Sequence, residues 1–299
     1  MKNIDVVVVT EDRYLNPTEI NDYNKNVLLE DRLVIEALEK QGLKADRKSW
    51  SDTSFNWSST KYILFRSTWD YFDRYSEFEN WLGKVTSETI LLNSANTIQW
   101  NIDKHYLLDL QEKGIPVCET HFIEKGTITS LLELHQKLGW KKTVLKPCIS
   151  GAARHTYKLD LNNLDKHENI FQKLIANEAM MLQPFQENIV TKGEYSFMVM
   201  NGKYTHAVLK IAKPGDFRVQ DDFGGSVHIH EATPEEKTFA EKAVLACPEL
   251  PMYARVDVII DNNNNLAISE VELIEPELWF RNHHEAATVL AKGIKKLIA

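Results

Sequence analysis

The sequence predicts a mixed α/β (α+β) protein, with a small parallel sheet near the N-terminus and more strands toward the C-terminus. Within the first 95 residues, short apolar runs alternate with a segment of helical periodicity, which is typical of parallel β-α-β units. From residue 180 onward, β-type runs follow one another with few helical segments between them. The chain has 299 residues, enough for two or three structural units.

In the first 95 residues we expect three strands and one long helix. The run at 4–10 (IDVVVVT) is typical of a buried strand, and shorter runs at 62–67 and 88–92 predict two more. Residues 27–41 carry apolar side chains at helical spacing. Gly42 is suited to end that helix, because glycine adopts positive φ without strain.

The remaining elements are predicted from the same patterns. We expect helices at 102–113, 128–138, 163–179, 234–246 and 284–298, and strands at 143–146, 180–185, 195–200, 204–212, 253–260 and 266–274. The run from Ser150 to Thr156 is a loop of small residues with polar ends. Asp261 and the four asparagines that follow predict a tight turn between the last two strands, since asparagine tolerates positive φ.

Composition excludes several classes of protein. The net charge is −8 and no run of basic residues is longer than a pair, so nothing favours nucleic acid or an anionic membrane as a partner. Three widely spaced cysteines argue against a disulfide framework or a cysteine zinc site. No secretory leader and no long apolar segment are evident, and we therefore expect a cytoplasmic protein.

Three carboxylates are predicted to gather on the last hairpin. Glu270 and Glu272 point to the same face of a strand because they are two residues apart, and the hairpin brings Asp257 toward that face. Such a group of charges is costly to bury, and a hard cation such as Mg²⁺, which prefers oxygen ligands, relieves the cost. The alternative is a solvent-facing polar side of an ordinary hairpin.

Two lysines are candidates for phosphate binding. Lys146 ends an apolar strand next to the small-residue loop, whose backbone N–H groups can approach phosphate oxygens closely, and Lys104 starts a predicted helix. Taken singly, each lysine is also compatible with a solvated surface position, and the loop is not a P-loop because it has one glycine.

Three arginines are candidates for binding a carboxylate or a phosphoryl group. Arg66 follows a strand, Arg218 lies in a polar loop, and Arg255 alternates onto the face of Asp257. The alternative for Arg66 is a structural ion pair with Asp70 or Asp73. The pair His228 and His230 has no third metal ligand nearby in the sequence and is interpreted as surface histidines.

The order of these motifs resembles that of the ATP-grasp superfamily over about residues 90–280. The motifs are Asn101-x-Asp103-Lys104, Leu145-Lys146-Pro147 with the small-residue loop, Gln183-Pro184-Phe185, Gly193-Glu194-Tyr195-Ser196, Arg255-x-Asp257 and Glu270-x-Glu272. Further motifs resemble the glutathione-synthetase branch, and within it the cyclo-ligases that close O-ureido-serine in cycloserine biosynthesis. These are Arg66-Ser67-Thr68-Trp69-Asp70-Tyr71, Asp216-Phe217-Arg218-Val219-Gln220, Phe223-Gly224-Gly225 and Glu272-Leu273-Ile274-Glu275-Pro276.

The resemblance implies a role for each matched residue. ATP would be bound by Lys104, Lys146, the loop residues Ser150, Gly151 and Ala152, the hinge Gln183, Pro184 and Phe185, and the ribose-binding Glu194. Magnesium would be held by Asp257 and Glu270, and by Glu272 where the family commonly has asparagine. Substrate would contact Arg66, Ser67, Arg218, Gly224 and Gly225, and Lys146, Arg218 and Arg255 would act in catalysis.

The implied protein is an ADP-forming carboxylate–amine ligase of antibiotic or amino-acid metabolism. It would have an N-terminal substrate unit (1–95), a small ATP-grasp unit (96–182) and a C-terminal unit with the metal hairpin (183–299). Its cofactors would be ATP and Mg²⁺, with Mn²⁺ as an alternative, and its substrate a small amino-acid-like molecule, closed on itself or joined to another. A homodimer is left open. A phosphotransferase and a non-catalytic nucleotide-binding regulator are the competing interpretations.

Overall fold

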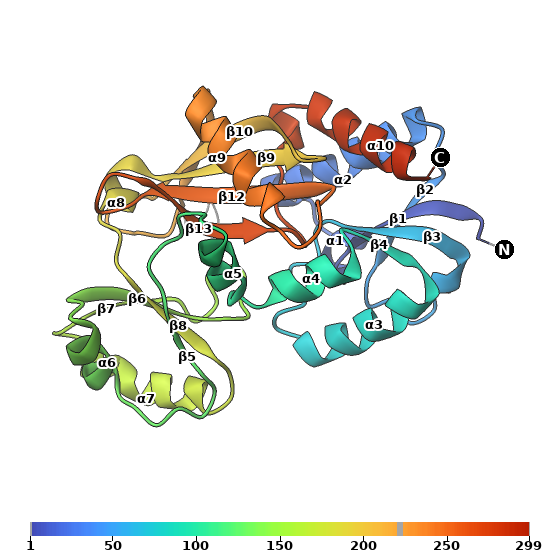
Figure 1. Cartoon of the computed structure of the whole chain (residues 1–299). Helices are drawn as coiled ribbons and strands as arrows, with labels where there is room; N and C mark the ends of the chain where they lie inside the picture. The colour runs from blue at the N-terminus through green and yellow to red at the C-terminus, as the bar shows by residue number, and fades with distance from the viewer. Residues whose placement is uncertain (1, 220–223, 299) are drawn as a thin grey trace.

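A computed structural model describes residues 2–219 and 224–298, which contain three sheets (Figure 1). The first sheet is parallel, with strand order β2-β1-β3-β4. Its unit consists of β1 (Ile4–Thr10), α1 (Asp12–Leu15), α2 (Asp22–Lys40), β2 (Ala45–Ser49), η1 (Trp57–Ser59), β3 (Thr60–Phe65), α3 (Tyr75–Glu88) and β4 (Ile90–Leu92). The predicted N-terminal parallel sheet is therefore confirmed, with β2 as an additional edge strand.

The second sheet is antiparallel, with strand order β5-β8-β6-β7, and α6 and α7 pack against it. Figure 1 shows this sheet and its two helices set apart from the other two sheets. This part of the chain contains α4 (Ala95–Ile102), α5 (Tyr106–Glu112), β5 (His121–Ile123), α6 (Leu131–Leu138), β6 (Lys142–Pro147), β7 (Tyr157–Asp160), α7 (Leu164–Ile175) and β8 (Met180–Pro184).

The third sheet is also antiparallel, with strand order β11-β10-β9-β12-β13. Its elements are α8 (Asn188–Lys192), β9 (Glu194–Met200), β10 (Lys203–Ile211), β11 (Ser226–His230), α9 (Pro234–Leu245), β12 (Tyr253–Ile260), β13 (Leu266–Glu272), η3 (Phe280–Asn282) and α10 (Glu285–Ile298). The last helix, α10, lies beside α2, and one apolar core joins Val8 and Leu38 of the first unit to Met198 and Leu290 of the third (Figure 1).

The structure corrects the predicted helix at 102–113. Asp103 has an extended backbone, and the N–H of Lys104 donates to the carbonyl oxygen of Cys148 (3.0 Å) instead of continuing a helix. The chain therefore forms two helices, α4 and α5, and the break between them brings Lys104 toward the strand that ends at Pro147. The predicted helix at 163–179 likewise ends earlier, at Ile175.

The outer edge of β13 is paired largely with side chains. The Asn101 amide donates to the carbonyl oxygen of Val271 (2.7 Å) and accepts from the N–H of Leu273 (2.8 Å), while the Tyr106 hydroxyl accepts from the N–H of Val271 (2.9 Å). Buried backbone groups need such partners. These contacts therefore fix the strand that carries Glu270.

A second buried asparagine joins the first sheet to the third. Asn93 follows β4, and its amide nitrogen donates to the carbonyl oxygens of Tyr253 (2.9 Å) and Leu273 (2.7 Å). Its side-chain oxygen accepts from the N–H of Met252 (2.6 Å). The two asparagines thus hold the C-terminal hairpin against the N-terminal part of the chain.

We predict that Asn101→Ala destabilises the protein by about 2–4 kcal/mol, because it leaves the N–H of Leu273 and the carbonyl of Val271 without their partner. Denaturant unfolding measures the change. Asn96→Ala is the matched control, since Asn96 is exposed on the same helix and bonds the side chain of Glu249. Equal stability of the two variants would contradict this account.

Candidate active site

The hairpin of β12 and β13 places the acidic residues as the sequence predicts. Asp257 lies directly opposite Glu270, and Arg255 lies opposite Glu272. The turn that joins the strands is closed by the Asp261 carboxylate, which accepts from the N–H groups of the third and fifth turn residues (2.8 Å each). The predicted grouping of carboxylates on one sheet face is therefore confirmed.

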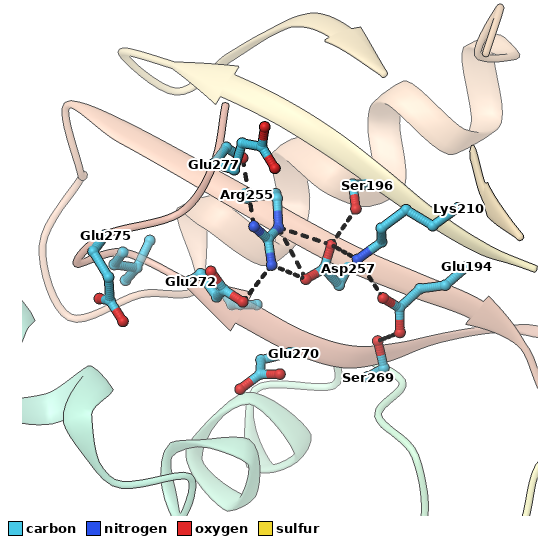
Figure 2. Close-up of polar contacts among 12 residues, drawn as sticks. Glu194, Ser196, Lys210, Arg255, Asp257, Ser269, Glu270, Glu272, Glu275 and Glu277 are labelled. Atoms are coloured by element: carbon cyan, nitrogen blue, oxygen red, sulfur yellow. Dashed lines mark hydrogen bonds and ion pairs between the residues drawn. The ribbon is translucent and has the colours of Figure 1, made fainter. Parts of the chain in front are cut away.

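Asp257 is almost fully buried and is surrounded by donors. Its carboxylate accepts hydrogen bonds from Arg255 Nε (3.0 Å) and Nη2 (2.8 Å), from Lys210 Nζ (3.3 Å) and from the Ser196 hydroxyl (Figure 2). Burial acts to raise the pKa of Asp257, but Arg255 and Lys210 outweigh it and lower that pKa to about 2. The group is therefore ionised at neutral pH.

Lys210 extends this network to a neighbouring strand. It lies opposite Glu194 in the pairing of β9 with β10, and its Nζ is 2.5 Å from Glu194 Oε1. The other oxygen of Glu194 accepts from the Ser269 hydroxyl (2.9 Å) (Figure 2). Sequence reasoning missed Lys210, although a lysine within an otherwise apolar strand, next to the strand of Glu194, is a signal that could have identified it.

Glu270 is paired with a lysine from the break between α4 and α5. Lys104 Nζ lies 2.8 Å from Glu270 Oε1 and donates to the carbonyl oxygen of Ser150 (2.6 Å). Burial acts to raise the pKa of Glu270, but the charges of Lys104 and Lys146 lower it. The two lysines predicted to bind phosphate are thus brought to the same carboxylate.

The next two acids along the chain behave differently. Burial raises the pKa of Glu272 to about 7 even though Arg255 contacts it, because Asp257 and Glu270 are close by. Burial and the charge of Glu272 raise the pKa of Glu275 to about 8. Each carboxyl therefore holds a proton far more strongly than an exposed glutamate does.

The small-residue loop is packed and has an unusual backbone. A side chain at Gly151 would meet the Phe72 ring at 2.5 Å, so only glycine fits there. Ala152 and Ala153 have positive φ values of 48° and 56°, which non-glycine residues adopt rarely. Such backbone strain often accompanies functional loops.

A cavity of about 210 Å³ unites all of the predicted ATP and metal residues. It is lined by Lys104, Lys146, Ser150, Gly151, Ala152, Gln183, Pro184, Phe185, Glu194, Arg218, Arg255, Asp257, Glu270 and Glu272. Lys210, Glu275 and Tyr71, to which the sequence interpretation gave no role, also line it. Arg218 lies at this cavity with its guanidinium bonded to Asp216 (2.8 Å from Nη2).

Several predicted substrate residues lie elsewhere. Arg66 is buried and stacks over the rings of Tyr253 (5.9 Å) and Phe280 (5.5 Å), and the alternative ion pair to Asp70 or Asp73 is absent among the described contacts. Ser67 is also buried, and its hydroxyl bonds Thr10 (2.6 Å) and Asp31 (3.1 Å). Neither residue lines this cavity or the second cavity beside it.

The predicted glycine motif is only partly covered by the structure. Gly224 and Gly225 are described, and neither lines the two cavities. Gly224 has a φ of 81°, which suits glycine. Gln220 and Phe223, which belong to the same motifs, lie outside the described residues.

Comparisons with known proteins define the class. Residues 118–276 match the family model of the ATP-grasp domain of prokaryotic glutathione synthetase, more than half of the chain. The chain therefore belongs to this family of ATP-grasp ligases. Residues 6–93 match the model of the N-terminal domain of D-cycloserine synthetase DcsG.

Individual relatives agree with this assignment. The chain is 26% identical over 280 residues to the cycloserine biosynthesis protein DcsG of Streptomyces lavendulae, covering 87% of this chain and 91% of that protein. Its fold resembles the crystal structure of D-cycloserine synthetase DcsG (TM-score 0.87, 24% identity, 98% and 99% of the two chains covered). It also resembles D-alanine–D-alanine ligase from Bacillus anthracis (TM-score 0.68, 15% identity, 99% and 98% covered).

Within the described ranges, none of the helices combines the length and apolar character needed to cross a membrane.

We predict that Glu270→Gln lowers turnover by roughly 100-fold or more, because it removes a charge opposite Asp257 where phosphate and metal charges would meet. Asp257→Asn should do the same, with some loss of stability because Arg255 and Lys210 lose their counter-ion. Steady-state ADP release measures turnover, and circular dichroism verifies folding. If the folded Glu270→Gln variant turned over at the wild-type rate, a role of Glu270 in the active site would be contradicted.

The raised pKa of Glu275 predicts a pH-dependent stability. The pKa of a glutamate is about 4.3 in an unfolded chain, whereas the pKa of Glu275 in the folded protein is about 8. The protonated carboxyl therefore stabilises the fold at low pH, and this contribution is lost as the pH rises toward 8. The carboxamide in the Glu275→Gln variant does not titrate, so the variant lacks this contribution to the pH dependence. The variant should gain stability relative to wild type on going from about pH 5 to about pH 8.5, as measured by denaturant unfolding. The same difference in unfolding free energy between variant and wild type at both pH values would contradict the prediction.

Proposed function

We propose that this ligase phosphorylates a substrate carboxylate with ATP and joins the resulting acylphosphate to an amine. The observation that carries the proposal is the meeting of Lys104 and Lys146 with the opposed carboxylates Asp257 and Glu270 in one cavity. Phosphoryl transfer does not require the protein to form covalent bonds to the substrate. It needs cations and metal-holding acids arranged around the phosphates.

The ATP would extend from the hinge to the hairpin. Gln183, Pro184 and Phe185 line the cavity at the end of β8, where their backbone can read the adenine ring. Lys104 Nζ uses two of its three donors on Glu270 and Ser150, which leaves one for a phosphate oxygen. Lys146 lines the same cavity from the end of β6.

The hairpin residues suit a hard cation. Asp257, Glu270 and Glu272 present carboxylate oxygens along one sheet face, and such donors are typical of Mg²⁺ sites, with Mn²⁺ accepted by similar ligands. These residues would hold the ion, which when bound would neutralise charge on the phosphates. Arg255 positions Asp257 and Glu272 for this role by bonding both.

The reaction consists of two steps. A carboxylate oxygen of the substrate attacks the γ-phosphorus, the bond to the β-phosphate oxygen breaks, and ADP leaves. An amine nitrogen then attacks the carbonyl carbon, the carbon–oxygen bond to the phosphoryl group breaks, and phosphate leaves with the amine proton. Lys104, Lys146 and Arg255 offset negative charge throughout, and Arg218 lies at the cavity where it can contact the transferring group.

We further propose that the substrate is a small amino-acid-like molecule and that the bond formed closes a ring. Support comes from the relatives, since the N-terminal domain model and the relative that matches most of the chain both belong to cycloserine synthesis. An enzyme of this kind would act in the cytoplasm, where ATP is available. Ligation of two separate molecules is the alternative for the same chemistry, as in D-alanine–D-alanine ligase.

We predict that turnover yields ADP and phosphate, and that hydroxylamine added with the acid substrate and Mg·ATP yields a hydroxamate, because an acylphosphate is electrophilic. Nucleotide chromatography and the colour of the iron–hydroxamate complex measure the two products. AMP with pyrophosphate would contradict the proposal. A stable phosphorylated alcohol would point instead to a phosphotransferase, and absence of any product to a regulator.

A further inference from the structure

A second cavity of about 670 Å³ adjoins the ATP cavity. Both are lined by Gly151, Ala152, Lys210, Arg255, Glu272 and Glu275. A carboxylate that receives the γ-phosphoryl group must lie at this shared boundary. The rest of its substrate then extends into the second cavity, toward the residues that only this cavity contacts.

One part of the wall of the second cavity is aromatic. Tyr14, Tyr23 and Trp69 all line it, and their rings lie within 6.5 Å of one another (Tyr14–Trp69 5.6 Å, Tyr23–Trp69 6.4 Å, Tyr14–Tyr23 6.5 Å). The Trp69 indole N–H donates to the backbone oxygen of Glu275 (2.7 Å), which ties this wall to the segment after β13. Grouped aromatic faces attract cations through their π electrons.

Among the described residues, one carboxylate of this cavity has no ion-pair partner. Glu272 is paired with Arg255, and Glu277 is paired with Arg281 (2.5 Å). For Glu275, no ion pair exists within residues 2–219 and 224–298, and Figure 2 shows it apart from the network around Asp257. Burial and the charge of Glu272 raise its pKa to about 8, so a cation that arrives beside it would favour its ionised form.

The cations that line the second cavity are already committed. Lys210 is held by Glu194 and Asp257, and Arg13 is held by Glu11 and lies over one face of the Tyr14 ring (4.7 Å to its centroid). A positive charge brought in by a ligand would therefore find Glu275 as its counter-ion, beside the aromatic wall.

Resting on the proposed ligase function, we propose that the second cavity binds the ammonium group of an amino-acid substrate, with Glu275 as its counter-ion and the rings of Tyr14, Tyr23 and Trp69 as a cation-binding wall. This subsite determines the orientation in which the substrate binds. The carboxylate lies toward Arg255 and the small-residue loop, and the ammonium group lies toward Glu275. Acids without an amino group then bind poorly, whatever their shape.

The test compares amino acids with analogues in which hydrogen replaces the amino group. D-serine, D-alanine and O-ureido-D-serine are paired with 3-hydroxypropanoate, propanoate and 3-(ureidooxy)propanoate. Each is titrated by calorimetry into the full-length protein with Mg²⁺ and a non-hydrolysable ATP analogue. In wild type, at least one amino acid should bind about tenfold or more tightly than its partner, since a charge-assisted contact is lost with the amino group.

Variants locate the effect. Glu275→Gln should bring that ratio close to one while leaving the affinity for the ATP analogue unchanged, which also shows that the variant is folded. Tyr23→Leu should reduce the ratio by about threefold, and Tyr23→Phe should retain it, because the ring and not the hydroxyl provides the attraction. Glu249→Gln is the control for an exposed glutamate far from both cavities and should retain the ratio.

Three results would overturn the subsite: equal binding of every pair, no binding of any amino acid, or an unchanged ratio in Glu275→Gln. An unchanged ratio in Glu275→Gln is also the result expected if Glu275 binds a second metal ion, because such an ion would not distinguish an amino acid from its analogue. ADP release measured with the same compounds tests the proposed function separately. Release stimulated equally by both members of a pair would retain the ligase and reject the subsite.

Discussion

The concentration of carboxylates on the inner face of the last hairpin is the constraint on which the rest of this structure depends. Asp257, Glu270 and Glu272 lie side by side because the register of β12 and β13 leaves them no other face. Their mutual repulsion in a poorly solvated place is tolerable only with cations nearby. The protein supplies Arg255 from the same strand, Lys210 from β10 and Lys104 from the break between α4 and α5. Arg255 and Lys210 belong to the same sheet as the acids, whereas Lys104 comes from outside it, so the site is complete only when the segment between α4 and α5 has docked on the hairpin.

The same constraint explains why the N-terminal part of the chain is bound so closely to the hairpin. Asn93 and Asn101 complete the hydrogen bonds of the strand that carries the acids, and Trp69 bonds the segment that carries Glu275. Helices and loops of the N-terminal part of the chain thus hold the acidic strand and also form one wall of the second cavity. By contrast, the middle sheet contributes Lys146 and leads into the small-residue loop, and both line the ATP cavity.

The elements and site residues that could be predicted from the sequence are those whose structure is determined by neighbouring residues in the chain. Alternation within 253–260 and 266–272, with an asparagine turn between them, was sufficient to predict the hairpin and its shared acidic face. The strands β2, β7 and β11 were missed because short runs rich in polar residues are typical of loops, and β5 was missed because it has three residues. Lys210 and Glu275 were given no role because their importance comes from partners distant in the sequence. The surroundings of Arg66 could not be predicted for the same reason, since the rings of Tyr253 and Phe280 that it contacts are far along the chain.

The central claim is that the cavity activates a carboxylate by transferring the γ-phosphoryl group of ATP to it. Oxygen-isotope transfer tests this most directly. The acid substrate is labelled with ¹⁸O in its carboxylate, incubated with enzyme and Mg·ATP in unlabelled water, and the released phosphate is analysed by mass spectrometry or by ³¹P NMR. Passage through an acylphosphate predicts that each phosphate formed carries one ¹⁸O from the acid. Unlabelled phosphate, or label found in AMP, would contradict the account.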